Sequence, residues 1–171
     1  RFENKGNSTG RSSEEIRLLR LIYEAMQSGR KIHIRYKNWR GENKKVVCSP
    51  SWLEYSRRDN VFRVWYYNRK LKRVMKINVP RILSAVQMQD TGYDLHEEQK
   101  ITDKAIKASM KSIAVEFCQG SRNLPDRILT EFSLWEKQCT YDSDTGKYTM
   151  TIHYPKFDEK EILVRLMGYG P

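Results

Sequence analysis

Apolar residues between positions 12 and 29 recur at every third or fourth position, which is the spacing of an amphipathic helix. The segment reads SSEEIRLLRLIYEAMQSG. Ser12 precedes Glu15 by three residues, as in a capping box, and Gly29 is a typical helix stop. The pattern therefore predicts a helix of about four turns. One stripe of this helix is predicted to face the core: Ile16, Leu19, Ile22 or Tyr23, and Met26.

From residue 30 the apolar period drops to two, which indicates strands. The segment KIHIRYK places Ile32 and Ile34 on one face and basic side chains on the other. Pro50 interrupts the run KVVCSPSWLEY, where a strand tolerates proline only at an edge or a bulge. Short runs at roughly ten-residue spacing predict a small antiparallel barrel or a strongly bent sheet. The predicted strands are 31–37, 45–55, 61–67, 74–79 and 81–88.

Residues 89–101 are polar and rich in turn formers, and they predict a linker. A short helix is predicted to follow, with Thr102 as its N-cap. The chain is thereby divided into three parts, a barrel with its leading helix, a linker with the short helix, and a second module. The predicted boundaries are 12–89, 90–111 and 112–171.

The second module reads as strand, helix, strand, strand, helix. Its firmest feature is a hairpin, because Asp144, Thr145 and Gly146 lie between two alternating runs. The order β-α-β-β-α is one strand short of a ferredoxin-like unit. We therefore expect a missing last strand or a piece cut from a longer chain, and Arg1 in place of an initiator Met favours the second. The predicted fold class of the whole chain is α+β.

The net charge of +11 is distributed unevenly. Residues 1–90 hold 21 Lys and Arg against 8 Asp and Glu, whereas residues 91–171 hold 11 against 13. All of the basic excess therefore belongs to the first module, which predicts attraction to polyanions.

Several classes of protein are disfavoured by the sequence. No apolar run approaches the roughly 20 residues of a membrane span, and the start lacks a secretion signal, so we expect a soluble cytoplasmic protein. The cysteines, Cys48, Cys118 and Cys139, lack metal-ligand spacing and predict reduced thiols without a metal or cofactor. The three histidines are scattered and no catalytic or phosphate-cradling motif is present, so no enzyme activity is predicted.

A candidate binding surface lies in VFRVWYYNRKLKRVMKINVPRI, residues 61–82. Arg63, Trp65 and Tyr67 share one strand face, and flat rings beside cations suit the bases and phosphates of a single strand or a nucleotide. The structural alternatives are that Trp65 is buried beneath the first helix and that the charges at the hairpin tip are merely solvated. The residues predicted to bind nucleic acid or ligand are His33, Arg35, Arg63, Trp65, Tyr67, Arg73, Lys76 and Arg81.

Residues 14–89 resemble a WYL domain, an SH3-like or Sm-like β-barrel module of bacterial regulators. The family's Trp-Tyr-Leu triplet is matched by Trp65-Tyr66-Tyr67. The segments IHIRYKNWRG and KVVCSP and the closing PRI occur in the family's order, and the resemblance makes Arg81 the basic position near the ligand site. Residues 112–171 are similar to the WCX-type C-terminal extension, a ferredoxin-like unit whose final helix often ends in Gly-Pro, as it does here.

The resemblance implies a dimeric transcriptional regulator whose N-terminal winged helix-turn-helix lies upstream of Arg1. Such proteins are frequent in phage-defence and DNA-damage loci, and their barrel is taken to sense a nucleic-acid or nucleotide ligand. The leading hypothesis is therefore the ligand-sensing and dimerisation region of a WYL-type regulator. The alternative is an accessory protein-interaction module that docks an acidic partner. A third option is an Sm-like RNA-binding module without a regulatory role.

Overall fold

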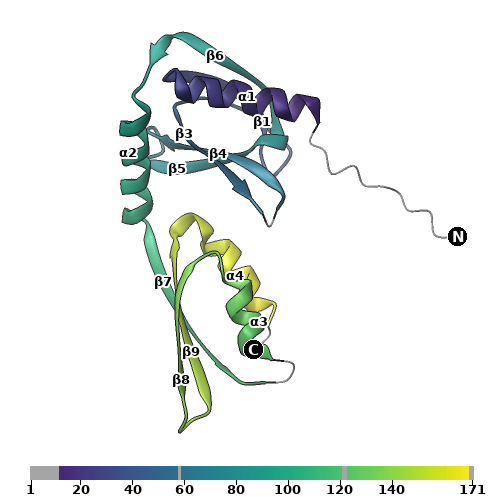
Figure 1. Ribbon diagram of the computed structural model, residues 1–171, viewed down its shortest axis with the longest axis vertical. Helices are drawn as coiled ribbons and strands as arrows, with labels where there is room; N and C mark the ends of the chain where they lie inside the picture. The colour runs from purple at the N-terminus through teal and green to yellow at the C-terminus, as the bar shows by residue number, and fades with distance from the viewer. Residues whose placement is uncertain (1–11, 58, 121–122, 170–171) are drawn as a thin grey trace, which may run out of the picture. The chain divides into compact units, whose positions relative to one another are not determined.

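The computed structural model describes residues 12–57, 59–120 and 123–169. This part of the chain is mixed α+β, as predicted, and contains four α-helices and three small antiparallel sheets. It divides into two compact units, the first ending at Ala105 and the second beginning at Ile106. Figure 1 labels the elements of each unit.

Helix α1 (Ser13–Gln27) begins as the capping pattern predicts, because the Ser12 hydroxyl accepts a hydrogen bond from the backbone N–H of Glu15 at 3.1 Å. The predicted core stripe is partly wrong. Ile16 is 48% exposed, because it lies two residues from Leu18 and so on a different face of the helix. Tyr23 is likewise exposed. The buried residues are Leu18, Ile22, Ala25 and Met26.

Gly29 joins α1 to the first strand at a place where no side chain fits. Its φ is +61°, and a Cβ there would lie 2.4 Å from the carbonyl oxygen of Tyr93. The Gly29 carbonyl in turn accepts a hydrogen bond from the Tyr93 N–H at 2.7 Å. The helix stop foreseen in the sequence therefore also fixes the far end of the last strand of this unit.

Six strands follow, and they form two separate three-stranded sheets. The first sheet has the order β2-β1-β6 and the second has the order β3-β4-β5. A 3₁₀ turn, η1, joins β5 to β6. The bounds are β1 Arg30–Lys37, β2 Asn43–Cys48, β3 Pro50–Ser56, β4 Val61–Asn68, β5 Arg73–Asn78, η1 Val79–Arg81 and β6 Ile82–Gly92.

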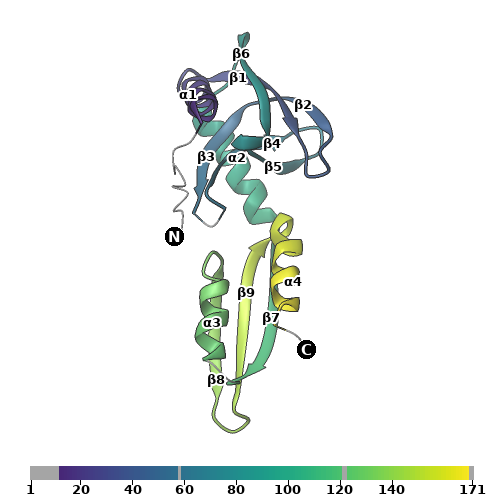
Figure 2. The same ribbon diagram turned by 90° about the vertical axis from the view of Figure 1, so that its right-hand side faces the viewer.

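The predicted closed barrel is not present in the described residues. Residues 45–55 were expected to form one strand. Instead β2 ends at Cys48, and β3 begins at Pro50 in a different sheet. Proline lacks the N–H that a continuous ladder requires, so the chain turns there. The two sheets instead share one core with α1, to which Ile32 and Val64 belong. In Figure 2 strands β1 and β2 arch over β4 and β5.

The predicted linker 89–101 is also corrected. Strand β6 continues to Gly92, and helix α2 (Leu95–Ala108) begins soon afterwards. Asp94 supplies the start of this helix, since its carboxylate accepts a hydrogen bond from the Glu97 N–H at 2.9 Å. Thr102 is therefore not an N-cap. It lies fully buried in the middle of α2.

Helix α2 is held against β3 by buried polar groups. The hydroxyls of Ser51 and Thr102 lie 2.7 Å apart, and both residues are 0% exposed. The side-chain amide of Gln99 donates to the Ser51 carbonyl at 3.1 Å. These contacts are directional, so they specify one position of the helix on the strand.

The second unit has the predicted β-α-β-β-α order. Its three strands pair in the order β7-β9-β8, and its core includes Phe132 directly after α3, Ile152 of the central strand and Ile162 of α4. The hairpin forms at the predicted turn, where Gly146 has a φ of +65°. The bounds are β7 Met110–Cys118, α3 Leu124–Glu131, β8 Glu136–Asp142, β9 Lys147–Pro155, η2 Lys156–Asp158 and α4 Glu159–Met167.

We expect Ser51→Ala to lower the free energy of unfolding by about 1 to 3 kcal/mol, because it leaves the buried Thr102 hydroxyl without a hydroxyl partner. The double change Ser51→Ala/Thr102→Val should be less destabilising than the sum of the two single changes. Urea denaturation followed by circular dichroism measures both. The exposed Ser133→Ala is the matched control, and equal losses for Ser51→Ala and Ser133→Ala would contradict the prediction.

Candidate ligand-binding pocket

The aromatic residue singled out by the sequence, Trp65, lies on the outer face of the second sheet. In register it is paired with Trp52 on one side and Lys76 on the other. The Lys76 ammonium lies 4.2 Å from the centroid of the Trp65 ring, and the indole N–H donates to the Glu54 carboxylate at 2.6 Å. The ring is half-buried. One of its faces is therefore already occupied by a cation of the same chain.

Arg63 lies on the same face and is also engaged. Its guanidinium pairs with Asp59, and its side chain is 20% exposed. The register places Arg63 opposite Glu54, the acceptor of the Trp65 indole N–H. Two of the three acidic residues between Lys31 and Arg81 thus lie among the predicted binding residues, where they offset part of the positive charge.

His33 and Arg35 do not join this face. They belong to β1, which pairs with β2 and β6 and not with β4. His33 is half-buried and aligned with Val47 and Val86, whereas Arg35 is exposed. Because the inner faces of both sheets meet in one core, the predicted residues are divided between surfaces on different sides of the unit.

Arg73 and Arg81 lie apart from Trp65 as well. Arg73 is the first residue of β5 and pairs with Asn68. It lies three positions before Lys76, so the two residues belong to opposite faces of the strand. Arg81 ends the 3₁₀ turn η1 and is exposed. The eight predicted residues therefore do not form one continuous site.

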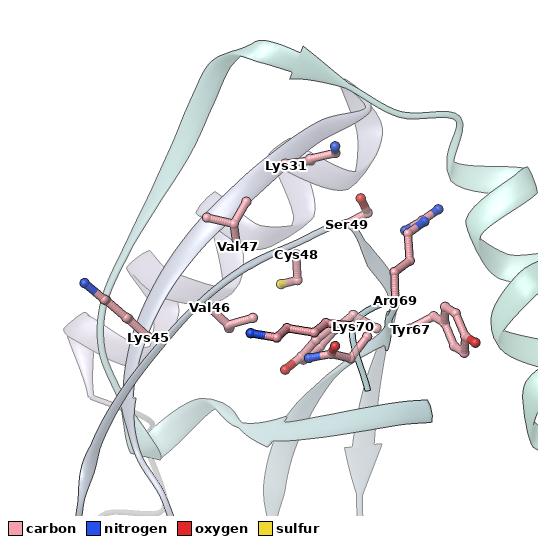
Figure 3. A pocket seen from close by; sticks show the side chains of 11 residues that line it. Lys31, Lys45, Val46, Val47, Cys48, Ser49, Tyr67, Arg69 and Lys70 are labelled. Atoms are coloured by element: carbon pink, nitrogen blue, oxygen red, sulfur yellow. The ribbon is translucent and has the colours of Figure 1, made fainter. Parts of the chain in front are cut away.

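A cavity of about 410 Å³ opens instead where β2 passes the end of β4. We call it the basic pocket. Figure 3 shows the Lys70 side chain running past Cys48 toward Val46, with the ends of the Lys31, Lys45 and Arg69 side chains directed outward and Tyr67 directed away from Lys70. The pocket is lined by Lys31, Lys45, Val46, Val47, Cys48, Ser49, Tyr66, Tyr67, Asn68, Arg69 and Lys70.

The rim of the basic pocket is strongly positive. Four of its lining residues are basic and none is acidic. Within the described part of the chain no carboxylate pairs with Lys31, Lys45 or Lys70, whereas Arg69 is paired with Glu98 of α2. Unpaired cations around a hollow raise the local concentration of anions.

The floor of the pocket is neutral. Burial raises the pKa of the Cys48 thiol to about 12, and burial also raises the pKa of the Tyr66 hydroxyl. Both groups stay protonated at neutral pH, so Cys48 is not a nucleophile there. A neutral floor beneath a cationic rim fits a ligand with a flat uncharged part and an anionic part.

Of the eight binding residues predicted from the sequence, only Tyr67 lines this pocket. The basic residues Lys31, Lys45, Arg69 and Lys70 contribute to the positive charge of residues 1–90, but they line one cavity only because β2 lies beside the end of β4. The feature of the sequence that could have indicated this pocket is the Arg69-Lys70 pair, which closely follows the aromatic triplet.

No cluster of metal-ligating side chains is found among the described residues. None of the helices in the described residues is long and apolar enough to span a membrane.

Comparisons with known proteins give no family assignment. No protein-family model and no curated protein matches the chain. Among solved structures, proteasome accessory factor B/C (PafBC) of Arthrobacter aurescens aligns with 85% of this chain at 18% identity. The TM-score is 0.40, and the chain spans 22% of the length of that protein. This similarity establishes neither a shared fold nor a function.

We expect the exposed Cys118 and Cys139 to react with a disulfide reagent at pH 8 in the folded protein, whereas Cys48 reacts only after unfolding. The reason is that a pKa of about 12 leaves almost no Cys48 thiolate at that pH. Partial burial raises the pKa of Cys139, so its reaction should be slowed. Absorbance of the released thiolate counts the reactive groups. Cys48→Ser should leave the fast phase unchanged, and a fast phase that includes Cys48 would contradict the assignment of the pocket floor.

Proposed function

We propose that this chain is the ligand-sensing and dimerisation region of a cytoplasmic bacterial WYL-type transcriptional regulator, and that its first unit binds single-stranded nucleic acid or a nucleotide at the basic pocket. The role is binding and not catalysis. The observation that carries the proposal is the rim of Lys31, Lys45 and Lys70, which has no carboxylate paired with it in the described chain.

The chemistry of the pocket favours a phosphorylated ligand. Its volume of about 410 Å³ is within the range of roughly 300 to 1,000 Å³ that small-molecule sites occupy. Lysine ammonium groups neutralise phosphates without fixed geometry, and the apolar floor around Cys48 accepts the flat part of a base. A nucleotide, or one end of a single strand, supplies both parts.

The residues predicted from the sequence take different places in this proposal. Tyr67 belongs to the wall of the pocket. We assign Trp65, Lys76 and Arg63 to a peripheral role, because Glu54 and Asp59 already engage two of them. His33, Arg35, Arg73 and Arg81 add to the positive field that attracts a polyanion before it reaches the pocket.

The regulatory part of the proposal comes from the resemblance. Its order of motifs, from IHIRYKNWRG to the closing PRI, is that of a sensor module that acts on a DNA-binding domain upstream. Ligand binding would then shift the equilibrium between forms that bind and do not bind DNA.

The first test is a titration with a short fluorescently labelled single-stranded oligothymidylate over a range of salt concentrations. We expect log affinity to fall linearly with log salt, because bound phosphates release counterions. Lys70→Gln should weaken binding and reduce the salt slope by about 0.7, the contribution of one phosphate contact in a single strand. Fluorescence anisotropy measures both quantities.

Lys156→Gln is the matched control, because Lys156 is an exposed lysine of the second unit. It should bind like the unchanged protein. An affinity that does not depend on salt concentration, or an equal loss of affinity in Lys70→Gln and Lys156→Gln, would contradict binding at the basic pocket.

A second candidate function is an accessory module that docks an acidic protein on the outer face of the first sheet. The observation in its favour is the pair of exposed apolar side chains beside His33, with Val47 at 49% and Val86 at 60% exposure. Protein interfaces combine such apolar centres with a charged rim. Two results would together favour this function. The oligonucleotide would not bind at low salt, and its addition would not alter the Trp fluorescence of the original protein or of Trp65→Ala.

Dimerisation is a separate part of the proposal. Helix α4 of the second unit exposes Leu163, Val164 and Met167, the last at 79%, and these apolar side chains are suited to contact another chain. We expect sedimentation equilibrium to report about twice the chain mass of 20.4 kDa. Val164→Lys should shift the mass toward the monomer. A monomeric mass for the unchanged chain at high concentration would refute this part.

A further inference from the structure

We propose that the basic pocket is coupled to helix α2 through Arg69, and that an anionic ligand in the pocket competes with Glu98 for this arginine and loosens α2 from β3. This inference rests on the proposed function, because it describes the response of that same site to its ligand. It assigns a direction to the response, in which binding at the pocket weakens the docking of α2.

Arg69 faces two anion sites at once. It lines the basic pocket, and its guanidinium contacts both carboxylate oxygens of Glu98, with Nη1 at 3.3 Å from Oε2 and Nη2 hydrogen-bonded to Oε1. The Arg69 side chain is 58% exposed, whereas that of Glu98 is 5% exposed. A ligand can therefore reach the arginine from the solvent, but it cannot reach the glutamate.

Glu98 depends on this single cation. Arg69 is its only basic partner within the described chain. Removal of one member of a buried ion pair is strongly unfavourable, because the remaining charge stays desolvated without compensation. A phosphate that takes over Arg69 therefore drives Glu98 toward water, and the first turns of α2 have to move with it.

The docking of α2 is suited to a two-state response. The buried residues of this helix are Glu98 and Thr102, both polar. Thr102 and Gln99 hold Ser51 through bonds of 2.7 and 3.1 Å, and the Ser51 hydroxyl also lies 3.5 Å from the Glu98 carbonyl. Such short directional contacts on one strand residue are lost together when the helix shifts. Helix α2 also precedes β7 of the second unit directly, so a change in α2 reaches the connection between the units.

Coupling between two sites is reciprocal. If ligand binding loosens α2, then the docked α2 must weaken ligand binding, because Glu98 keeps Arg69 engaged and unavailable to the ligand. Glu98→Gln removes the competing charge while the side chain keeps nearly the same shape. It should therefore tighten ligand binding at the pocket.

The test uses the full chain and the labelled oligothymidylate. Glu98→Gln should bind it about 5-fold or more tightly than the unchanged protein, within the usual range of coupling factors. Glu97→Gln is the matched control, because Glu97 is the preceding residue of α2, is exposed, and pairs with Lys100. It should leave the affinity unchanged. An equal gain for both variants would mean that general charge, and not competition for Arg69, is responsible.

Amide hydrogen exchange of residues 95–108 provides the second measurement and requires no variant. Oligothymidylate should speed exchange in α2 of the unchanged protein, and this effect should disappear in Glu98→Gln. Lys70-dependent binding without faster exchange in α2 would overturn the coupling and leave the proposed function standing. Absence of binding to both the unchanged protein and Glu98→Gln at low salt would overturn both.

Discussion

The structure of the first unit depends on the turn at Ser49 and Pro50. The apolar pattern there runs on without a break, but Pro50 has no N–H for a continuous ladder, and the chain passes from one sheet to the other. The two sheets then close on a shared core with α1. Because β2 and β3 diverge at this point, Lys31 and Lys45 of the first sheet lie beside the residues at the end of β4, and the basic pocket forms between them.

The distribution of acidic residues decides where the positive charge of the first unit is available. On the outer face of the second sheet, Glu54 and Asp59 engage Trp65 and Arg63. The lining of the basic pocket contains no carboxylate, and of its basic residues Arg69 is paired with the buried Glu98 of α2. Net charge therefore indicates the class of partner, whereas the placement of a few carboxylates selects the surface that attracts it.

Helix α2 shows how a polar contact ties a binding surface to the rest of a chain. A buried ion pair adds little net stability compared with apolar packing, so Glu98 and Arg69 are not needed to hold the core together. Their effect is to make the position of α2 depend on a cation that solvent and ligands can reach. The hydroxyl pair of Ser51 and Thr102 specifies the docked position but does not shield Arg69.

The sequence by itself determined the α+β class, helix α1 with its Ser12 cap, most strand positions, and the whole β-α-β-β-α order of the second unit. These features depend on periodicity and turn residues over about ten positions, which are local properties of the chain. Only the tertiary structure decided that β1 does not pair with β4, that Ile16 is exposed, and that Lys31 lines the same cavity as Arg69 and Lys70. Strand pairing and burial depend on contacts between residues far apart in the chain, and no local pattern records which of several apolar faces will share one core.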